Sequence, residues 1–247
     1  MGAIFPPEQE TRLVHEFFRT RGEGFFVEVG ANEPEHGSQS WHLEEAGWTG
    51  ILVEPQPELA EKLRHTRRAH VFAVACSSPE NAGRSLPLHL AGPLSALDRD
   101  RMSPGALRQT IIQVPIRTLD DILTEAKAPA PLDFLSVDVE GHEIDVLRGF
   151  DFKRWRPRLV LMEDHVANLD KHRFLQVAGY CLVRRTGVNG WYVPADTNVN
   201  FGWRERWQVI RKYYLALPFR ILRNVSRRLR QPFKDRRAGR GRLGGAR

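Results

Sequence analysis

The fold is decided by a short run near the N-terminus, FFVEVGAN (residues 25–32). The segment from Phe25 to Val29 is rich in aromatic and β-branched residues, so it predicts a strand, and Gly30 ends it. Apolar residues at helical spacing predict a helix before this strand, from Pro7 to about Gly22, and another after it, through Trp41 to Gly47. A strand between two helices is typical of an α/β sheet.

The same alternation continues along the chain. Further strands are expected at 50–55, 71–75, 132–139 and 158–162, and further helices at 57–68, after the candidate N-cap Thr118, at 143–148 and at 168–178. Extended runs on either side of Asn189-Gly190, at 180–183 and 191–193, predict a closing antiparallel hairpin. Residues 77–117 form a less regular insertion with two extended pieces, at 86–90 and 111–116. The pattern predicts an α/β fold, a mostly parallel sheet with helices on both faces.

The charge of the chain is divided between its two parts. Of 247 residues, 37 are Lys or Arg and 30 are Asp or Glu, so the net charge is +7. Residues 204–247 hold 15 basic and two acidic residues, a net +13, which leaves residues 1–203 with 22 against 28, a net −6. An acidic body disfavours a protein that binds nucleic acid along its main surface. The basic excess belongs to the tail alone.

Composition and cysteine usage indicate a soluble domain in a reducing compartment. Cys76 and Cys181 are far apart and no Cys-x-x-Cys motif occurs, so neither a disulfide framework nor a zinc ribbon is expected. The first residues show no basic region followed by an apolar run, and no apolar stretch approaches the roughly 20 residues of a spanning helix. We therefore expect a cytoplasmic protein, at the inner face of the membrane if its tail binds lipid.

Four of the predicted strands end in polar, mostly acidic residues. These strand ends are Glu28 to Asn32, Glu54, Asp138 to His142, and Glu163 to His165. The carboxyl ends of parallel strands meet at one edge of a sheet, and such sheets bind their ligands at that edge. A single strand-end carboxylate is most often a helix cap or a solvated group, but four such ends together predict a ligand site.

The first two strand ends indicate the kind of cofactor. Glu54 follows the second strand, the position that binds the two hydroxyls of an adenosine ribose. The first loop has only Gly30 in place of the G-x-G-x-x-G motif of a dinucleotide site, and Glu33 and Glu35 would repel a pyrophosphate. A cationic adenosine cofactor without phosphates is favoured. S-adenosylmethionine, which carries a sulfonium and an ammonium group, fits.

Four ordered motifs carry a family resemblance. They are FVEVGAN (26–32), GILVEP (50–55), RTLDDIL (117–123) and FLSVDVEGHE (134–143), the last followed by VLRG (146–149). Together they resemble the FkbM family of S-adenosylmethionine-dependent O-methyltransferases, over about residues 24–195. The resemblance implies the seven-stranded class I methyltransferase fold, which is Rossmann-like.

The resemblance also implies roles for individual residues. It places Glu28, Gly30, Ala31 and Asn32 at the methionine end of the cofactor and Glu54 at the ribose. Many members of the family have a small residue two places after the Asn, where this chain has Pro34. The next helix is therefore expected to begin later than in those members.

Methyl transfer to a hydroxyl requires aligned reacting atoms and a group that takes up the proton. The predicted catalytic residues are Asp138, Glu163 and His165, at the ends of two neighbouring strands. His142 is an alternative base, although it also stands where a helix begins, and Glu140-Gly141 is interpreted as a structural turn.

A metal site is the alternative to a base. Asp138, Glu163 and Asp164 would offer the oxygen ligands that Mg²⁺ prefers. The placement of this cluster is similar to that of the metal site of macrocin-type sugar O-methyltransferases. Magnesium is therefore a second expected cofactor.

The C-terminal part is expected to form a separate tail after a methyltransferase domain at 1–203. Apolar residues from Trp207 to Leu229 recur every three or four positions with Arg and Lys between them, which predicts a basic amphipathic helix over 204–233. Such a helix can bind an anionic membrane surface, pack on the domain or form a dimer contact. The Arg- and Gly-rich end, 234–247, is expected to be disordered.

These features predict a methyltransferase that acts on a hydroxyl of a glycan, a glycolipid or another small-molecule natural product. Two alternatives from other classes stay open: an RNA-binding methyltransferase that uses the basic tail, and a catalytically silent adenosyl-binding module. The acidic body disfavours the first, and the polar set at four strand ends disfavours the second. The sequence leaves the acceptor and the oligomeric state open.

Overall fold

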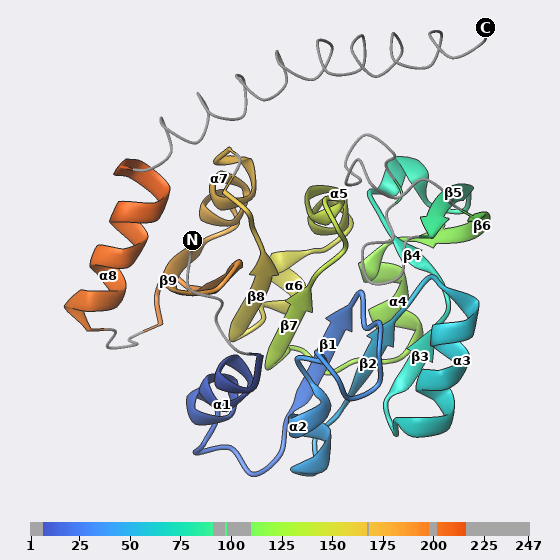
Figure 1. Ribbon diagram of the computed structural model, residues 1–247, viewed down its shortest axis with the longest axis horizontal. Coiled ribbons are helices and arrows are strands. Elements are labelled where there is room, and N and C mark those ends of the chain that lie inside the picture. Colours follow the sequence, from blue (N-terminus) through green and yellow to red (C-terminus); the bar gives the residue numbers. More distant parts are fainter. Residues whose placement is uncertain (1–6, 91–96, 98–109, 167, 198–201, 216–247) are drawn as a thin grey trace, which may run out of the picture.

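A seven-stranded sheet forms the centre of the molecule (Figure 1). The computed structural model describes residues 7–90, 97, 110–166, 168–197 and 202–215. The strand order is β3-β2-β1-β7-β8-β10-β9, and β10 runs in the direction opposite to the other strands of this sheet. The strands are β1 (Phe25–Val29), β2 (Thr49–Val53), β3 (His70–Phe72), β7 (Phe134–Val137), β8 (Leu159–Glu163), β9 (Tyr180–Thr186) and β10 (Asn189–Pro194). The predicted class I methyltransferase fold, with its closing antiparallel hairpin, is confirmed.

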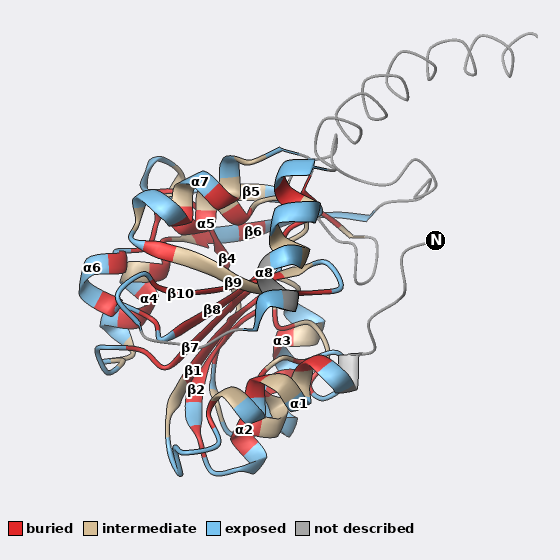
Figure 2. Cartoon of the chain, turned by 90° about the vertical axis from the view of Figure 1, so that its left-hand side faces the viewer, coloured by how far each residue is buried: buried red, intermediate tan, exposed pale blue. Residues whose placement is uncertain are grey.

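Helices cover both faces of the sheet, and the strands are buried between them (Figure 2). One core cluster joins the sheet to α1 (Pro7–Phe17), α2 (Trp41–Glu45) and α3 (Pro57–Thr66). The other joins it to α4 (Leu119–Glu125), α5 (Glu143–Arg148), α6 (Phe152–Trp155) and α7 (Asp170–Val177). Alternate strand residues enter opposite clusters because the side-chain period of a strand is two. In β1, Phe26 belongs to the first cluster, and Val27 and Val29 to the second.

A second, three-stranded sheet lies beside β3. It consists of β4 (Ala75–Cys76), β6 (Thr110–Arg117) and β5 (Ser85–Leu90), with the short 3₁₀ helix η1 (Pro79–Asn81) between β4 and β5. The predicted single strand at 71–75 is therefore wrong. The chain leaves the main sheet after Phe72, and Ala75 and Cys76 pair with β6 instead of β2. The two extended pieces expected in the 77–117 insertion are confirmed as β5 and β6.

Local capping explains where two of the helices begin. The Thr118 hydroxyl accepts a hydrogen bond of 3.1 Å from the Asp121 amide, so α4 begins as predicted. The four-residue helix α6 was not predicted, because so short a helix shows no apolar period. Asp151 accepts from the amides of Lys153 and Arg154 and starts it. The opening helix α1 ends at Phe17, earlier than the expected Gly22.

The described beginning of the tail packs on the domain. Helix α8 (Trp203–Val209) continues into the π-helical segment η3 (Ile210–Leu215), and α8 lies against β9. Tyr213 is fully buried there. The rest of the predicted amphipathic helix and the Arg- and Gly-rich end fall in 216–247, outside the described residues. The division at residue 203 stays a prediction. Within the described ranges, no helix is long and apolar enough to cross a bilayer.

Candidate active site

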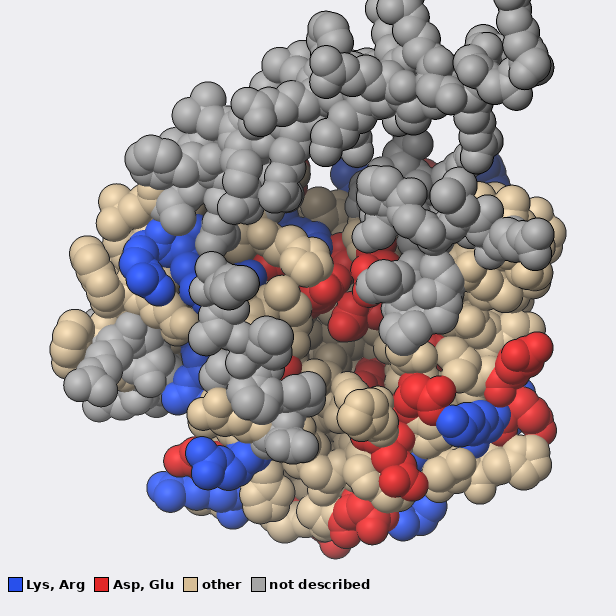
Figure 3. Space-filling view, viewed as in Figure 1, with Lys and Arg blue, Asp and Glu red and all other residues tan. Residues whose placement is uncertain are grey.

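A cavity of about 1050 Å³, open mouth included, lies at the carboxyl ends of β1, β2 and β7. One wall is apolar and is formed by Val53, Pro55, Val74, Leu88 and Leu97, so the insertion contributes to it. The polar part of the lining includes the carboxylates of Glu54, Asp138 and Glu140. Figure 3 shows acidic side chains gathered around the hollow at the centre of this face. The position is the one that the strand-end residues predict.

Gly30 lets the ends of β1 and β7 approach each other closely. Its φ angle is +84°, and a Cβ atom there would lie 1.8 Å from the carbonyl oxygen of Asp138. Gly30 also donates its amide to Val53 at 2.9 Å, and the Asp138 amide donates to Val29 at 3.0 Å. Three neighbouring strand ends are thus joined at one point, and only glycine fits there.

Glu54 is buried at the floor of the cavity. Its Oε2 accepts a hydrogen bond of 2.9 Å from the Asn32 amide, and its Oε1 accepts one of 2.9 Å from the Gln56 amide. Burial raises the pKa of this carboxyl, against the effect of the two amides. Each oxygen keeps a second lone pair for a ligand hydroxyl. Glu54 therefore suits the ribose role that the resemblance implies.

Glu28 lines the same cavity, but its carboxylate is engaged with the chain itself. Oε2 accepts hydrogen bonds from the hydroxyls of Ser38 and Ser40, and Oε1 accepts one of 2.7 Å from the Gln39 amide. These three bonds hold the loop that follows the cofactor motif. The geometry gives Glu28 a positioning role for this loop, and the contact with the methionine end of the cofactor that the resemblance implies stays a prediction.

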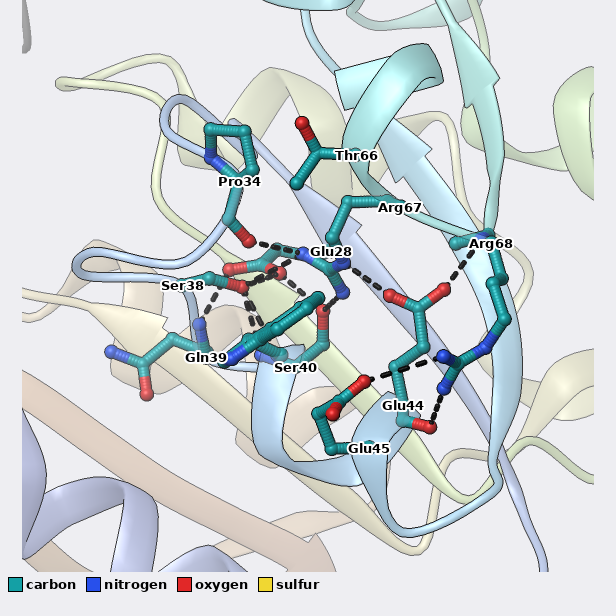
Figure 4. Close-up of polar contacts among 12 residues, drawn as sticks. Glu28, Pro34, Ser38, Gln39, Ser40, Glu44, Glu45, Thr66, Arg67 and Arg68 are labelled. Carbon is teal, nitrogen blue, oxygen red and sulfur yellow. Dashed lines mark hydrogen bonds and ion pairs between the residues drawn. The ribbon is translucent and has the colours of Figure 1, made fainter. Parts of the chain in front are cut away.

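Arg67 completes the support of this loop, and the sequence did not reveal it (Figure 4). Its guanidinium is fully buried, forms an ion pair with Glu44, and donates to the carbonyl of Pro34 at 2.9 Å. It also donates to the hydroxyls of Ser40 at 2.9 Å and Ser38 at 3.2 Å. Helix α2 begins only at Trp41, after this network, as Pro34 led us to expect.

Three carboxylates meet beside the cavity. Asp138, Glu140 and Glu163 each offer one oxygen, and these oxygens all lie within 4.8 Å of one another. The predicted set contained Asp164 instead of Glu140, and the structure does not bring Asp164 to this place. Asp164 turns into the protein, where it accepts hydrogen bonds from the Val166 amide and the Tyr213 hydroxyl. Successive residues at a strand end point to opposite faces, so Glu163 and Asp164 diverge.

Glu140 enters the cluster through the turn after β7. Its φ angle is +50° and that of Gly141 is +96°, so the backbone reverses direction sharply there. The interpretation of Glu140-Gly141 as a structural turn is correct for the backbone. For the Glu140 side chain it is incomplete, because that carboxylate belongs to the acidic set.

The carboxylates of the cluster perturb one another. Asp138 still opens to the cavity, yet the protein packed around it, and then the charges of Glu163 and Glu140, raise its pKa well above the ordinary value. Burial alone would raise the pKa of Glu163, but hydrogen bonding and charge from His165 outweigh it and lower that pKa. A proton shared within the cluster therefore resides on Asp138 in preference to Glu163.

His165 and Glu163 form a hydrogen-bonded pair. The distance from His165 Nε2 to Glu163 Oε1 is 2.9 Å, and the histidine side chain is 64% exposed. The hydrogen bond to Glu163 raises the pKa of His165. Neither residue lines the cofactor cavity, although Asp138 and Glu140 do. The pair therefore lies outside the cavity lining, and Glu163 connects it to the acidic cluster.

His142 lies in the cavity wall and is held from both sides. Its Nε2 is 2.9 Å from the Ser77 hydroxyl, and its Nδ1 is 3.4 Å from Asp145. It also precedes α5, as expected of a residue at a helix start. These contacts favour the structural interpretation over the alternative of a base.

Lys171 is a second residue that sequence patterns did not reveal. Its ammonium donates to the Glu163 carbonyl at 2.9 Å and lies 2.6 Å from the buried carboxylate of Glu143. Glu143 in turn accepts from the Gly141 amide at 2.7 Å. Lys171 thus connects the turn after β7 with the end of β8, which carry the two halves of the acidic cluster.

Comparison with known proteins identifies the family. The model of the methyltransferase FkbM domain matches residues 28–182. The chain belongs to the FkbM methyltransferase family. A curated relative, "Methyltransferase 1" of Beauveria bassiana (strain ARSEF 2860), is 46% identical over 44 residues, 18% of each chain. The match therefore spans less than one fifth of that relative.

Solved structures with a similar arrangement include three methyltransferases. One from Geobacter sulfurreducens has a TM-score of 0.41 and 14% identity, with 74% of this chain and 77% of that chain covered. A putative RNA methyltransferase from Pyrococcus horikoshii has a TM-score of 0.40 and 11% identity, with 76% and 83% covered. A precorrin-6y C5,15-methyltransferase from Geobacter metallireducens has a TM-score of 0.39 and 12% identity, with 75% and 86% covered.

Membership of the FkbM methyltransferase family implies S-adenosylmethionine as the cofactor, and the lining of the cavity suits this molecule. The apolar wall beside β2 and β4 suits an adenine ring, and Glu54 at the floor suits the ribose. The acidic lining complements the positive charges of the sulfonium and the ammonium.

Proposed function

We propose that this FkbM-family enzyme is an O-methyltransferase whose acceptor is a hydroxyl of a glycan, a glycolipid or another small-molecule natural product. The observation that carries the proposal is the pair of His165 and Glu163 beside the cofactor cavity. When Nε2 donates to Glu163, Nδ1 is the nitrogen that accepts a proton. A hydroxyl needs such a base because it is a weak nucleophile when protonated.

The cofactor, when bound, supplies an electrophilic methyl group on a sulfonium. Glu54 and the backbone from Gly30 to Asn32 would hold it. His165 would take the proton of the acceptor hydroxyl as its oxygen displaces sulfur at the methyl carbon, and Glu163 would stabilise the imidazolium that forms. Alignment of the reacting atoms contributes on the order of 7–11 kcal/mol, and a base contributes about 10²–10⁴-fold.

A divalent cation is the alternative to a base for activating the acceptor hydroxyl. Asp138, Glu140 and Glu163 offer three oxygen ligands close together, a donor set that suits Mg²⁺. A cation there would lower the pKa of the bound hydroxyl. We favour the base, because Glu163 is already hydrogen-bonded to His165.

The charge of the site favours a neutral acceptor. Three carboxylates lie together at this edge of the sheet, and they would repel a phosphate-rich acceptor. This argues against RNA as the substrate and supports the hydroxyls of neutral sugars or related natural products. The cluster of Asp138, Glu140 and Glu163 at the strand ends argues against a catalytically silent module.

The test is transfer of a labelled methyl group to neutral oligosaccharides, glycolipids and lipid extracts, with and without a chelator. We expect a methyl ether as product, retained activity with chelator, and a loss of kcat of about 10²–10⁴-fold in His165→Gln. His65→Gln is the matched control, since His65 is also an exposed histidine that contacts a glutamate, Glu61. The control should keep full activity.

Three results would contradict the proposal. Methyl transfer to nitrogen or carbon instead of oxygen would exclude an O-methyltransferase. Loss of activity with chelator would assign proton removal to a cation at the carboxylates. A His165→Gln variant as active as the wild type would remove His165 from the mechanism.

A further inference from the structure

The segment after β10 exposes a row of large apolar side chains. Trp203, Trp207, Ile210 and Tyr214 recur at spacings of four, three and four residues, and they are 73%, 53%, 44% and 50% exposed. We call these four residues the apolar row. They lie in α8 and η3, and the neighbouring Leu215 is also 54% exposed. Tyr213, in the same segment, is fully buried. One side of the segment therefore packs on the protein, and another presents apolar surface to solvent.

Such a row is unusual on a protein that stays in water, because contiguous exposed apolar patches mark contact sites. Its composition points to a particular kind of contact. Tryptophan and tyrosine have an apolar ring with one polar group, so they are enriched where hydrocarbon meets headgroups. Two of the six tryptophans of the chain stand in this row.

The charge of this segment, and of the sequence that follows it, indicates a partner with negative charge. Arg211 is exposed within the segment, next to Ile210. Residues 216–247 add eleven Lys and Arg against one acidic residue, Asp235. A partner that covers apolar rings and also carries negative charge satisfies both features. A nucleic acid supplies negative charge but has no apolar interior to cover the rings. A second copy of this chain has an acidic body, net −6 over residues 1–203, but it offers no hydrocarbon layer.

We propose that the apolar row docks the protein on an anionic membrane surface, with the rings of Trp203, Trp207 and Tyr214 at the level of the headgroups. Ile210 enters the hydrocarbon boundary, and the exposed Arg211 contacts anionic lipid. This docking surface goes beyond the proposed reaction and does not depend on it.

The buried side of the segment connects the apolar row to the end of β8. The Tyr213 hydroxyl donates to Asp164 at 2.8 Å, and Arg185 donates both to that hydroxyl and to the Asp164 carbonyl. Asp164 follows Glu163 directly. The row is thus attached to the end of the strand that carries the proposed base, so a docked enzyme presents that side of its site near the bilayer.

Flotation of the full chain with lipid vesicles tests the proposal. We expect association with vesicles of phosphatidylcholine and phosphatidylglycerol, weak association with phosphatidylcholine alone, and release at high salt. Trp207→Ser combined with Ile210→Ser should weaken the partition roughly tenfold or more, since each residue loses apolar area that the bilayer would cover. A blue shift of tryptophan fluorescence on addition of anionic vesicles is expected in the wild type and reduced in the variant.

Ile111→Ser is the matched control. Ile111 is 55% exposed on β6, at the far end of the molecule from α8 (Figure 1). The partition of the Ile111→Ser variant to vesicles should equal that of the wild type. Because the row is exposed, circular dichroism of the double variant should match the wild type.

Other outcomes would overturn the proposal. Equal partition of the double variant and the wild type would show that the basic tail acts without the row. Association with RNA that the double variant loses, without vesicle binding, would assign the row to a nucleic acid. A wild-type dimer in solution that the double variant converts to a monomer, again without vesicle binding, would assign it to a second copy.

Discussion

Tyr213 donates a hydrogen bond of 2.8 Å to the carboxylate of Asp164, 49 residues earlier in the chain. The bond joins the segment after α8 to the end of β8. It explains why Asp164 does not take part in the acidic cluster, because its second oxygen accepts the Val166 amide at 2.7 Å. The beginning of the basic tail is therefore integrated into the methyltransferase domain at the strand end that carries Glu163 and His165.

Removal of the Tyr213 hydroxyl should destabilise the protein. Tyr213→Phe leaves the buried Asp164 carboxylate and Arg185 each without one partner, which costs about 1–3 kcal/mol. Tyr214→Phe is the control, because that hydroxyl is on a half-exposed ring and its contact with His172 is longer, 3.3 Å. Urea unfolding of both variants measures the difference. Equal stabilities would show that the Tyr213–Asp164 bond contributes nothing net.

The close approach at Gly30 should make it far less replaceable than another glycine of the same loop. Gly30 and Gly37 have similar φ angles, +84° and +81°, so alanine brings similar backbone strain of about 1–2 kcal/mol at both. At Gly30 the added methyl also meets the Asp138 carbonyl at 1.8 Å, whereas at Gly37 nothing lies within 4 Å. Calorimetry should therefore find S-adenosylmethionine binding abolished in Gly30→Ala and retained in Gly37→Ala. Similar affinities in the two variants would refute the steric argument.

If Glu54 binds the ribose, its replacement should reduce the affinity for two related ligands equally. Glu54→Gln should weaken S-adenosylmethionine and S-adenosylhomocysteine equally, by about 10–100-fold, because both carry the same ribose and a charged hydrogen bond is worth about 1.5–3 kcal/mol. Burial raises the pKa of Glu54, so wild-type affinity should fall as acidification protonates this carboxylate. Glu58→Gln, in the first turn of α3, is the control. A larger loss for the sulfonium ligand alone would place Glu54 at the other end of the cofactor.

His42 predicts the pH dependence of folding stability. Burial, together with the positive charges of His15 and Arg67, lowers its pKa from 6.5 to about 4, and neither ring nitrogen has a hydrogen-bond partner among the described residues. Between these two pH values His42 binds a proton in the unfolded state but not in the folded state. The contribution of His42 to folding stability is therefore complete above about pH 6.5 and is lost as the pH falls toward 4. His42→Leu should reduce the fall in Tm between about pH 7 and about pH 4.5.

The control for this comparison is His65→Gln, which changes an exposed histidine of α3. It should keep the wild-type dependence of Tm on pH. If His42→Leu also keeps that dependence, the acid sensitivity of the protein arises from other groups.

Much of the fold could be predicted because it depends on local patterns. Strand β1 and helix α5 occur at the predicted residues, and the N-cap of α4 is Thr118. Apolar runs and capping residues act over a few positions, so they are visible in the chain itself. The strand order was predicted through the family motifs, which together imply one topology, and the structure confirms it.

The site could be predicted in its location and only partly in its members. Gly30 and Glu54 lie where the sequence placed them, because residues that end parallel strands must meet at one edge. The choice of Glu140 over Asp164 was not predictable. It depends on a positive φ at Glu140 and on a tyrosine 49 residues beyond Asp164.

The sequence by itself determined the family, the alternation of strands and helices, the edge of the sheet that holds the site, and the division of charge between body and tail. The tertiary structure alone decided that Arg67 supports the cofactor loop, that Lys171 joins two strand ends, and that Tyr213 holds the tail to β8. The physical reason is the distance along the sequence over which each interaction acts. Periodicity and capping are properties of neighbouring residues, whereas the direction of a buried polar side chain depends on partners that only folding brings near.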